Sequence, residues 1–369
     1  LYSEVWFHLD QLYRRFTYHV RSSGEASLME SLIEQIENLY TNNFLLKMND
    51  RWQSIVDEAT VWDASPILLQ RNFYERCVLP FLNKDNKIYV IISDAMRFEI
   101  GDELLSRIRK EDRYEATLEP MLSMLPSYTQ LGMAALLPNK DLALSIDGSG
   151  TVEVDSQSSQ GLVNRGKILQ SSLTGKHARV MLVDEFLTMP REGDEGYRAM
   201  FKDNDVVYLY HNRIDTVGDK RDTEENVFEA VEKALDELMI VIRKLSAANV
   251  TNMLVTADHG FIYQNRAIDE SDFSGMDAEG DQILFRDRRF VLGNGLKEIT
   301  GLRKFEPLQL GLVGEIEVQI PKSINRLRLK GSGSRFVHGG ASLQEVVIPV
   351  IKINKKRQSD ISTVEVDIL

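Results

Sequence analysis

The sequence contains 369 residues, of which 43% are hydrophobic, and it carries a formal net charge of −12 at pH 7. This length and composition supply an ample core for one large α/β domain with a smaller appendage. The acidic balance excludes a global attraction to nucleic acid, and the single cysteine, Cys77, excludes an intrachain disulfide. Neither a secretory signal nor a span of about 20 apolar residues is present, so no membrane association is expected. Because the sequence begins at Leu1 rather than at a methionine, we expect a fragment or a processed form.

Residues 1–85 form the first predicted region, and their pattern is helical. Apolar residues recur at helical spacing from Ser27 to Ala59, glycine is scarce, and Pro66 marks a break. We expect a helical region, or the end of a larger helical domain, that supports the following domain or binds a partner. His8 and His19 lie in this region, and we expect them to be structural.

A buried strand is predicted at Lys87–Asp94, where an apolar run ends on a carboxylate. A helical pattern follows from Ala95 to Arg109. Ligands bind at the carboxyl ends of the strands in α/β sheets, so Asp94 is a candidate ligand. Arg97 lies within one helical turn of Asp94, where it either contacts a phosphate or pairs with a carboxylate.

The segment Met124–Leu136 offers candidate nucleophiles. Ser127 and Thr129 follow Pro126 at the point where an apolar helix begins, and the first backbone N–H groups of such a helix could hold a phosphate. The alternative interpretation is that one of the two hydroxyls simply caps the helix. The sequence alone leaves both interpretations open.

A third apolar run, Asp205–Tyr210, predicts another buried strand, which leads into a turn containing Asp215 and Asp219. These two carboxylates are four residues apart. His211 comes just before them and either lies behind the site or faces the substrate. The pattern from Asp222 to Leu245 then predicts an amphipathic helix that connects this strand to the next as a parallel crossover.

The segment Met253–Gly260 ends an apolar run on an adjacent carboxylate and imidazole, Asp258 and His259. A run bounded by glycine is typical of a buried strand, and we expect both side chains to point into a site. The alternative is an aspartate that caps the next turn beside an ordinary histidine.

The last part of the chain combines basic residues with one more histidine. His338 precedes two glycines, which permit the close backbone approach that a crowded site needs. Alternation over residues 324–330 predicts a strand with a basic face, which either holds a polyanion or is merely solvated. Residues 345–351 predict a further strand, and residues 355–369 predict a linker and the start of a C-terminal β segment. The basic residues are Arg286, Arg288, Arg289, Lys322, Arg326, Arg328, Lys330 and Arg335.

Four aspartates and two histidines at separate strand ends form a candidate ligand set for two divalent ions. Imidazole suits zinc, whereas carboxylates accept zinc, manganese or magnesium. A hydroxyl is barely ionised at neutral pH, and coordination to such an ion stabilises its alkoxide as a nucleophile. The candidate ligands are Asp94, Asp215, Asp219, Asp258, His259 and His338.

In this order and spacing, five segments resemble the alkaline phosphatase superfamily and, within it, the PglZ domain. The resemblance covers residues 86–354 and implies an α/β fold with a mainly parallel sheet flanked by helices, after the helical region at residues 1–85. PglZ proteins belong to the BREX and Pgl bacteriophage-defence systems, so it also implies a cytoplasmic antiviral role beside other proteins of these systems. The matching segments are Ser93–Glu99, Pro126–Thr129, Asp215–Asp219, Thr256–Phe261 and Phe336–Glu345.

The resemblance assigns one ion to Asp94, Asp258 and His259, with Thr129 bridging to it as the nucleophile. The nucleotide pyrophosphatase/phosphodiesterase branch of the superfamily carries a Pro-Thr-x-Thr segment whose second threonine is the nucleophile. The corresponding segment here is Pro-Ser-Tyr-Thr, which favours Thr129 over Ser127.

The resemblance assigns the other ion to Asp215, Asp219 and His338. The same branch commonly has a histidine where this chain has Asp219. A further carboxylate makes the site harder and more anionic, which leaves the preference for zinc and the role of Asp219 open. We expect two divalent ions, with zinc as the first choice and manganese or magnesium as alternatives.

These features predict a metal-dependent phosphoester hydrolase, specifically a phosphodiesterase or nuclease that acts on DNA or RNA of the invading phage. An intact ligand set favours an enzyme, because folding alone does not require all these residues. The alternatives are an interaction scaffold in the defence complex with little or no catalysis, and a phosphomonoesterase. The candidates for substrate binding are Arg97, His211, Arg328 and Arg335.

Overall fold

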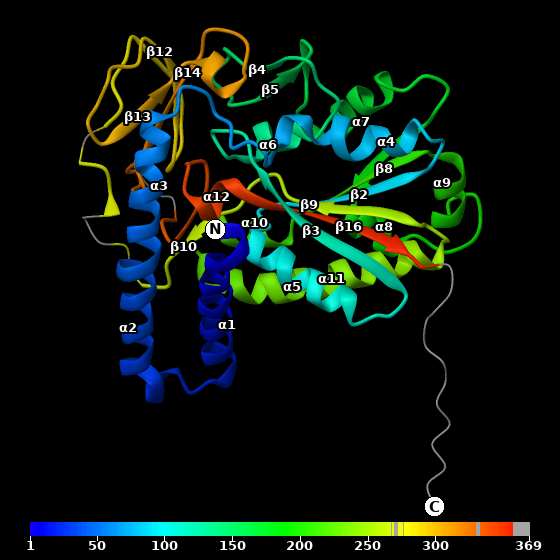
Figure 1. Ribbon diagram of the computed structural model, residues 1–369, viewed down its shortest axis with the longest axis horizontal. Coiled ribbons are helices and arrows are strands. Elements are labelled where there is room, and N and C mark those ends of the chain that lie inside the picture. Colours follow the sequence, from blue (N-terminus) through cyan, green and yellow to red (C-terminus); the bar gives the residue numbers. More distant parts are fainter. Residues whose placement is uncertain (267, 269–271, 276, 330–332, 357–369) are drawn as a thin grey trace, which may run out of the picture.

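The computed structural model describes residues 1–356 apart from 267, 269–271, 276 and 330–332 (Figure 1). The largest sheet within these residues has seven strands in the order β1-β3-β16-β9-β2-β8-β7. Neighbouring strands in it are parallel except that β16 is antiparallel to both β3 and β9. This confirms the predicted mainly parallel sheet. The strands are β1 (Leu68–Leu69), β2 (Ile88–Ser93), β3 (Tyr114–Leu122), β7 (Ala178–Leu182), β8 (Val206–His211), β9 (Asn252–Thr256) and β16 (Val347–Lys355).

Strands β2 and β8 are buried along their whole length. Their sequences are almost continuously apolar because helices cover both faces of the sheet, as parallel sheets require. Ser93 of β2 pairs with His211 of β8, and Ile92 pairs with Thr256 of β9. The carboxyl ends of three parallel strands therefore lie level with one another.

Helices pack on both faces of the sheet: α5 and α11 lie on one face, and α4, α6 and α7 lie on the other (Figure 1). The predicted helix at residues 222–245 is observed as α11, which follows β8 and leads to β9. Both strands are parallel to β2, so this connection is a parallel crossover. The helices are α4 (Leu79–Leu82), α5 (Phe98–Arg109), α6 (Thr129–Ala135), α7 (Gly161–Ser171), α8 (Val183–Thr188), α9 (Tyr197–Asp203), α10 (Arg213–Gly218), α11 (Val227–Ala247) and α12 (Leu343–Val346).

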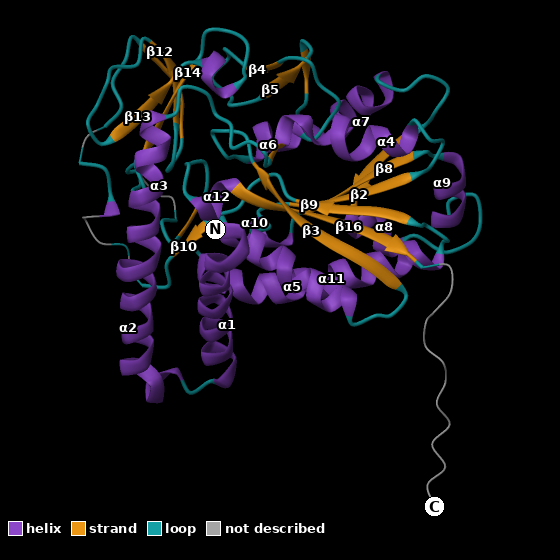
Figure 2. Cartoon of the chain, in the orientation of Figure 1, coloured by secondary structure: helices purple, strands orange, loops and turns teal. Residues whose placement is uncertain are grey.

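Smaller sheets stand to one side of the central sheet (Figure 2). One contains β4 (Leu142–Leu144), β5 (Val152–Val154) and β6 (Gln157–Ser158), and another pairs β10 (Ile262–Tyr263) with β15 (Phe336–Val337). The largest of them contains β11 (Gln282–Arg286), β12 (Val291–Asn294), β13 (Leu302–Phe305) and β14 (Glu317–Pro321).

The prediction of a strand at residues 324–330 is wrong. The described part of this segment is irregular, and Arg326 forms an isolated bridge with Phe273. The Arg326 side chain is buried, and it donates hydrogen bonds to the carbonyl oxygens of Ser334 and Ile324. The alternation of arginine and leucine therefore does not mark a solvent-facing basic surface.

The predicted N-terminal helical region is confirmed. It contains α1 (Phe7–Ser23), α2 (Glu30–Asn38) and α3 (Leu46–Glu58), and Figure 1 shows α1 and α2 side by side, outside the sheet. A π-helical turn, Leu39–Leu45, joins α2 to α3 without a break. Further short π- or 3₁₀-helical turns span Tyr2–Trp6, Ala26–Met29, Gln70–Asn72, Tyr74–Val78, Glu224–Asn226 and Pro307–Leu310.

A buried ion network joins α1 to the sheet-covering helices. The Arg14 guanidinium is fully buried and pairs with Glu99 and Glu103 of α5 and with Glu232 of α11. The Arg14–Glu99 and Arg14–Glu232 distances are 3.1 and 2.7 Å. A cation enclosed by three carboxylates fixes the orientation of α1 against the domain, because removing one partner leaves buried charge uncompensated.

The helical region also holds α12, near the end of the chain. Asn49 of α3 donates a hydrogen bond to Gln344 Oε1 at 2.9 Å and accepts one from the Leu343 backbone N–H at 2.9 Å. Gln344 Nε2 in turn donates to the buried Asp10 carboxylate of α1 at 3.2 Å. Asn49 and Asp10 lie 295 and 334 residues from Gln344 in the sequence, so α1 and α3 hold α12 in place.

The C-terminal predictions fall partly outside the described residues. The strand predicted at residues 345–351 is observed as β16, which begins two residues later because Ser342 and Glu345 form the capping box of α12. Of the linker and β segment predicted at residues 355–369, Lys355 ends β16 and residues 357–369 lie outside the described part. Among the described helices, none combines the length and apolar character needed to cross a bilayer.

Candidate metal centre

The candidate ligands gather where β2, β8 and β9 end. Asp94 follows β2, Asp258 comes two residues after β9, and Asp215 lies in α10, directly after β8. His338 follows β15 and reaches the same place. This is the edge at which open α/β sheets bind their ligands, because the carboxyl ends of parallel strands meet there.

A first group of possible ligand atoms belongs to Asp94, Asp258 and His259, and these atoms lie within 4.8 Å of one another. His259 Nε2 is 3.6 Å from Asp94 Oδ1 and 3.5 Å from Asp258 Oδ2. All three side chains are buried. The structure therefore brings together the three residues that were expected to hold one ion.

A second group belongs to Asp215, His259 and His338, again within 4.8 Å. His338 Nε2 is 3.7 Å from Asp215 Oδ1, and the two imidazole rings stack with their centroids 4.1 Å apart. His259 is a member of both groups, so the two candidate sites adjoin each other.

The backbone after Asp94 orients the Asp258 carboxylate. Ala95 has a φ of 60°, a left-handed conformation that costs a residue with a side chain about 1–2 kcal/mol. In this conformation its N–H donates to Asp258 Oδ1 at 3.1 Å, and the His259 N–H donates to the same oxygen at 3.0 Å. Asp258 Oδ1 is thus fixed by two donors, which leaves Oδ2 for the site.

The His259 ring is held by a hydrogen bond on its far side. His259 Nδ1 lies 2.9 Å from the Gly260 carbonyl oxygen, and since a carbonyl can only accept, Nδ1 carries the proton. In the neutral ring Nε2 then bears the lone pair. A backbone carbonyl on the second nitrogen is the usual partner of a metal-ligating histidine.

Burial and mutual repulsion disfavour ionisation of the three carboxyls. Burial raises the pKa of Asp94 well above its usual range, and the nearby Asp258 charge raises it further. Burial, followed by the Asp94 charge, raises the pKa of Asp215 to about 8. Burial raises the pKa of Asp258 to about 7, against the lowering effect of the Ala95 N–H. Burial also lowers the pKa of His338 well below its usual range.

These residues fit a divalent cation. Asp94 Oδ1, Asp215 Oδ1 and Asp258 Oδ2 are buried and accept no hydrogen bond from any described residue. Buried polar atoms without partners are costly, and three crowded carboxylates repel one another, so a cation between them removes both penalties. Carboxylate oxygens together with neutral imidazoles suit zinc, manganese or magnesium.

Thr129 is the first residue of α6, and its hydroxyl oxygen lies 3.1 Å from His259 Nε2. Ser127 instead turns away and donates to the Gly340 carbonyl oxygen at 2.6 Å. No side chain caps α6, whose N-cap residue is Tyr128. The capping interpretation is therefore wrong for both hydroxyls, and of the two only the Thr129 hydroxyl is directed at the side chain of a candidate ligand.

Close packing against the metal centre requires glycine within α6. A Cβ atom at Gly132 would lie 2.4 Å from the backbone carbonyl oxygen of Asp258. Real Cβ atoms do not approach a backbone oxygen so closely, so a glycine allows α6 to contact the Asp258 turn directly. This contact sets the position of Thr129 relative to the carboxylates.

Comparison with known proteins identifies the family. The model of the BREX system PglZ alkaline phosphatase-like domain matches residues 73–353. The chain belongs to the PglZ family. It is 36% identical over 362 residues to the alkaline phosphatase-like protein BrxZ of Escherichia coli O9:H4 (strain HS), covering 95% of this chain and 41% of that protein. It is 32% identical over 373 residues to the alkaline phosphatase-like protein PglZ of Bacillus cereus (strain H3081.97), covering 99% of this chain and 43% of that protein.

The PglZ-family chain thus spans about two fifths of the length of these curated relatives. Among solved structures, it is similar to murine ectonucleotide pyrophosphatase/phosphodiesterase 5, with 11% identity, 73% of this chain and 88% of that chain covered, and a TM-score of 0.43. It is also similar to phosphonoacetate hydrolase from Sinorhizobium meliloti 1021 in complex with phosphonoformate, with 13% identity, 72% and 89% coverage, and a TM-score of 0.44.

In this PglZ domain, Asp219 lies outside both ligand groups. It directly follows α10, and its half-exposed carboxylate pairs with the guanidinium of Arg288. Arg288 also donates to the Phe336 carbonyl oxygen at 3.1 Å, two residues before His338. Asp219 therefore contacts the side chain that supports the His338 strand, whereas Asp215 and His259 lie beside His338 itself.

Two candidates for substrate binding are internal in this PglZ domain. Arg97 is fully buried, pairs with Glu99 at 2.8 Å, and lies 4.7 Å from the centre of the Phe261 ring. His211 is buried as well, with Nδ1 3.0 Å from Ser93 Oγ and Nε2 3.0 Å from Glu237. Of the alternatives stated for Arg97, the structure shows a carboxylate partner, whereas His211 contacts Ser93 and Glu237 and lines a small pocket beside α10.

The two remaining candidates lie nearer the surface. Arg335 pairs with Glu225 at 2.7 Å, and the exposed Arg328 lies 4.6 Å from the centre of the Phe273 ring. Arg289, from the same predicted basic set, is fully buried and pairs with Glu345 at 2.7 Å. Much of the predicted basic surface is thus used inside the PglZ fold.

The sequence interpretation missed Glu345 as a positioning residue. Its carboxylate accepts hydrogen bonds from the Gly340 and Ser342 backbone N–H groups and pairs with Arg289, so it shapes the loop that follows His338. The signal was present, because Ser342-Leu343-Gln344-Glu345 has the Ser-x-x-Glu spacing of a capping box.

Proposed function

We propose that this PglZ domain is a metal-dependent phosphoester hydrolase that cleaves phosphodiesters. The observation that carries the proposal is the pair of adjoining ligand groups, whose carboxylate oxygens lack partners, with the Thr129 hydroxyl beside their shared histidine. Folding does not require three crowded carboxyls, since each would be more stable paired or solvated. A phosphoester hydrolase explains their presence.

In the proposed centre, Asp94, Asp258 and His259 hold one divalent ion, and Asp215 and His338 hold the other beside His259. When bound, the ions activate the nucleophile and stabilise the charge that develops on phosphorus and on the leaving oxygen. Zinc is the first candidate, and manganese and magnesium fit the same donor set. Asp219 is proposed as a positioning residue that acts through Arg288, because it belongs to neither ligand group.

Thr129 is the proposed nucleophile. Its Oγ forms a bond to phosphorus as the bond to the leaving oxygen breaks, its proton is lost to water, and the leaving group takes up a proton. Water then hydrolyses the phosphothreonine and restores the hydroxyl. The short α6 and the contact at Gly132 hold Thr129 in place before the substrate arrives, which reduces the entropic cost of the attack.

The proposed substrate is the phosphodiester backbone of DNA or RNA, in the setting of a BREX or Pgl defence system. The family match and the curated relatives support this setting. The net charge of −12 and the burial of several arginines give this chain little attraction of its own for a polyanion. We infer that other proteins of the system, or the remainder of a longer polypeptide, supply that affinity.

An interaction scaffold is the second candidate function, and one observation favours it. A groove of about 550 Å³ lies between α1 and the α2–η3 rod, η3 being the π-helical turn Leu39–Leu45, and exposed apolar residues line it. Among them, Leu12 and Leu39 are more than half exposed. Such a surface is typical of a contact with another protein. The scaffold function requires no hydrolysis, so it predicts phage protection that survives loss of Thr129.

The test compares hydrolysis of bis(p-nitrophenyl) phosphate with that of p-nitrophenyl phosphate, after removal of metals and addition of zinc, manganese or magnesium. We expect metal-dependent cleavage of the diester and a loss of about 10³-fold or more in Thr129→Ala. Thr129→Ser should retain part of the activity because it keeps the hydroxyl. The matched control is Thr174→Ala. This variant removes an exposed threonine that is distant in sequence from the residues of the candidate metal centre.

Faster turnover of the monoester would make the domain a phosphomonoesterase. No turnover of either substrate with any ion, together with unchanged thermal stability on adding the ions, would refute the hydrolase and favour the scaffold. Phage protection by Thr129→Ala in cells would also favour the scaffold over the hydrolase. The stability measurement reports ion binding independently of catalysis.

A further inference from the structure

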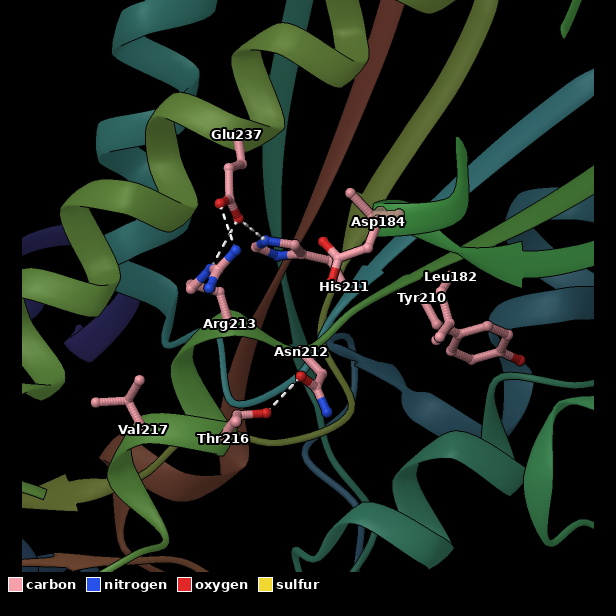
Figure 3. Close-up of a pocket in the computed structure, with 10 residues that line it drawn as sticks. Leu182, Asp184, Tyr210, His211, Asn212, Arg213, Thr216, Val217 and Glu237 are labelled. Atoms are coloured by element: carbon pink, nitrogen blue, oxygen red, sulfur yellow. Dashed lines mark hydrogen bonds and ion pairs between the residues drawn. The ribbon is translucent and has the colours of Figure 1, made fainter. Parts of the chain in front are cut away.

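A small pocket lies on the same edge of the sheet as the candidate metal centre, and Figure 3 shows the residues that line it. It has a volume of about 180 Å³ and lies where β7 and β8 end, between α8, α10 and α11. This is room for about six water molecules and less than the ~300 Å³ of the smallest drug-sized pockets. Apolar side chains of Leu182, Val183 and Val217 contribute part of its lining. It therefore suits one small, flat group.

The charged groups at one side of the pocket neutralise one another. Glu237 accepts hydrogen bonds from Arg213 Nη2 at 2.6 Å and Nε at 3.1 Å, and it lies 3.0 Å from His211 Nε2, as Figure 3 marks. The pKa of the Arg213 guanidinium is raised, first by its hydrogen bonds to Glu237. These three side chains are thus committed to one another and are not the groups that select a ligand.

Two other side chains of the pocket have hydrogen-bonding capacity to spare. The Thr216 hydroxyl donates to Asn212 Oδ1 at 2.5 Å, which fixes the orientation of the amide and leaves its N–H₂ as a donor. The exposed Asp184 carboxylate accepts no hydrogen bond from any described residue. Asp184 lines the same pocket as Asn212 and Arg213 (Figure 3).

The pocket is separated from the proposed centre by a single turn of chain. Asn212 lies three residues before Asp215, and Thr216 is the residue after Asp215. Residues three or four apart in a helix have Cβ atoms about 5–6 Å apart. In addition, the Asp94 N–H donates to the His211 carbonyl oxygen at 2.7 Å. A group attached to a phosphate in the metal centre can therefore reach the pocket.

We propose that this pocket binds a nucleobase next to the scissile phosphate and that it prefers guanine. The inference rests on the proposed phosphodiesterase function. Guanine presents two adjacent donors and one acceptor on its pairing edge, which match the two oxygens of Asp184 and the amide donor of Asn212. Adenine, cytosine and uracil or thymine do not place two adjacent donors on that edge. The apolar lining contacts the faces of the ring.

Binding of 5′-GMP, 5′-AMP, 5′-CMP and 5′-UMP to the manganese-loaded protein, measured by calorimetry, tests the proposal without requiring turnover. We expect GMP to bind about tenfold more tightly than the other three nucleotides. Asp184→Asn should abolish this preference, because an amide offers one acceptor instead of two. Asn212→Ala should weaken the binding of GMP more than the binding of AMP. The matched control is Asp203→Asn, an exposed aspartate at the end of α9.

Equal affinity for the four nucleotides, or a GMP preference that persists in Asp184→Asn, would overturn the base pocket. Circular dichroism and melting of each variant show that the fold is retained, and Asp184 and Asn212 are both exposed, so their substitution does not disturb the core. Bis(p-nitrophenyl) phosphate contains no nucleobase, so its hydrolysis tests the proposed function separately from the pocket. Retained hydrolysis without base preference would refute only the pocket.

Discussion

Metal removal should make the stability of this domain fall as the pH rises above neutrality. The pKa values of Asp258 and Asp215, about 7 and about 8, are raised far above that of an aspartate in an unfolded chain. The folded state therefore binds more protons than the unfolded state between about pH 4 and pH 8, and stability declines with pH across that window. The depressed pKa of His338 acts in the opposite direction, but only below its ordinary value of about 6.5.

Between pH 6.5 and pH 8, the change in stability therefore comes mainly from the titration of the buried aspartates. Over this window, linkage gives a loss of about 0.8 kcal/mol from Asp258 and about 1.6 kcal/mol from Asp215, and Asp94, whose pKa is also raised, adds to this loss. For a domain of this size, the loss of at least about 2.4 kcal/mol corresponds to a fall of at least about 3 °C in Tm. Asp215→Asn removes the Asp215 contribution, so its metal-free Tm should fall by about 2 °C less than that of the wild type over the same window.

The assay is thermal unfolding of protein treated with a chelator, at fixed ionic strength. The matched control is Asp50→Asn, which removes an exposed carboxylate of α3 and should follow the wild-type profile. Adding manganese to about 100 times its Kd should stabilise the wild type by about 2.7 kcal/mol and Asp215→Asn by less. A metal-free Tm that is flat or rises between pH 6.5 and pH 8, or an Asp215→Asn profile equal to that of the wild type, would refute the reasoning.

Three further predictions concern the packing around the centre. Arg14→Met removes the cation that Glu99, Glu103 and Glu232 share. Arg97 and Arg107 still pair with these carboxylates, so urea unfolding should give a loss at the low end of the range for a broken buried ion pair, about 3 kcal/mol. Asn49→Ala removes both hydrogen bonds to α12, and unfolding should show a loss of about 1–3 kcal/mol together with weaker metal binding by calorimetry. Gly132→Ala should lower metal affinity at least about tenfold, because its Cβ clashes with a backbone oxygen of the ligand turn. Gly275→Ala, where a Cβ meets nothing within 4 Å, should leave the affinity unchanged.

The structure brings five of the six predicted ligands together, because most of them follow strands that the apolar pattern predicts. Apolar runs that end on Asp94 and Asp258 are nearly sufficient to locate parallel strands with level carboxyl ends, and the structure has them adjacent. The turn with Asp215 follows the next strand in the same way. The fold class and the family were predicted correctly from the resemblance of five segments to the PglZ domain.

The basic residues could not be predicted from periodicity. Alternating Arg326 with leucine indicates a solvent-facing strand only if the arginine has no internal partner, and backbone carbonyl oxygens supply one. Arg289 is likewise buried, and it pairs with Glu345, which is 56 residues away in the sequence. Such long-range pairing leaves no local pattern. The expected place of Asp219 among the ligands came from the family resemblance, which does not specify the direction in which this side chain leaves the end of α10.

The position of β16 has a consequence for biosynthesis. This strand lies between β3 and β9 and is the last described element of the chain, so it joins two parts of the sheet that are made earlier. Until residues 347–355 leave the ribosome, β3 and β9 each expose an unpaired edge, and such edges pair readily with other chains. His338 emerges just before β16. The nascent chain should therefore acquire its complete sheet and its complete ligand set almost simultaneously, which limits premature metal capture but leaves the unfinished sheet dependent on chaperones.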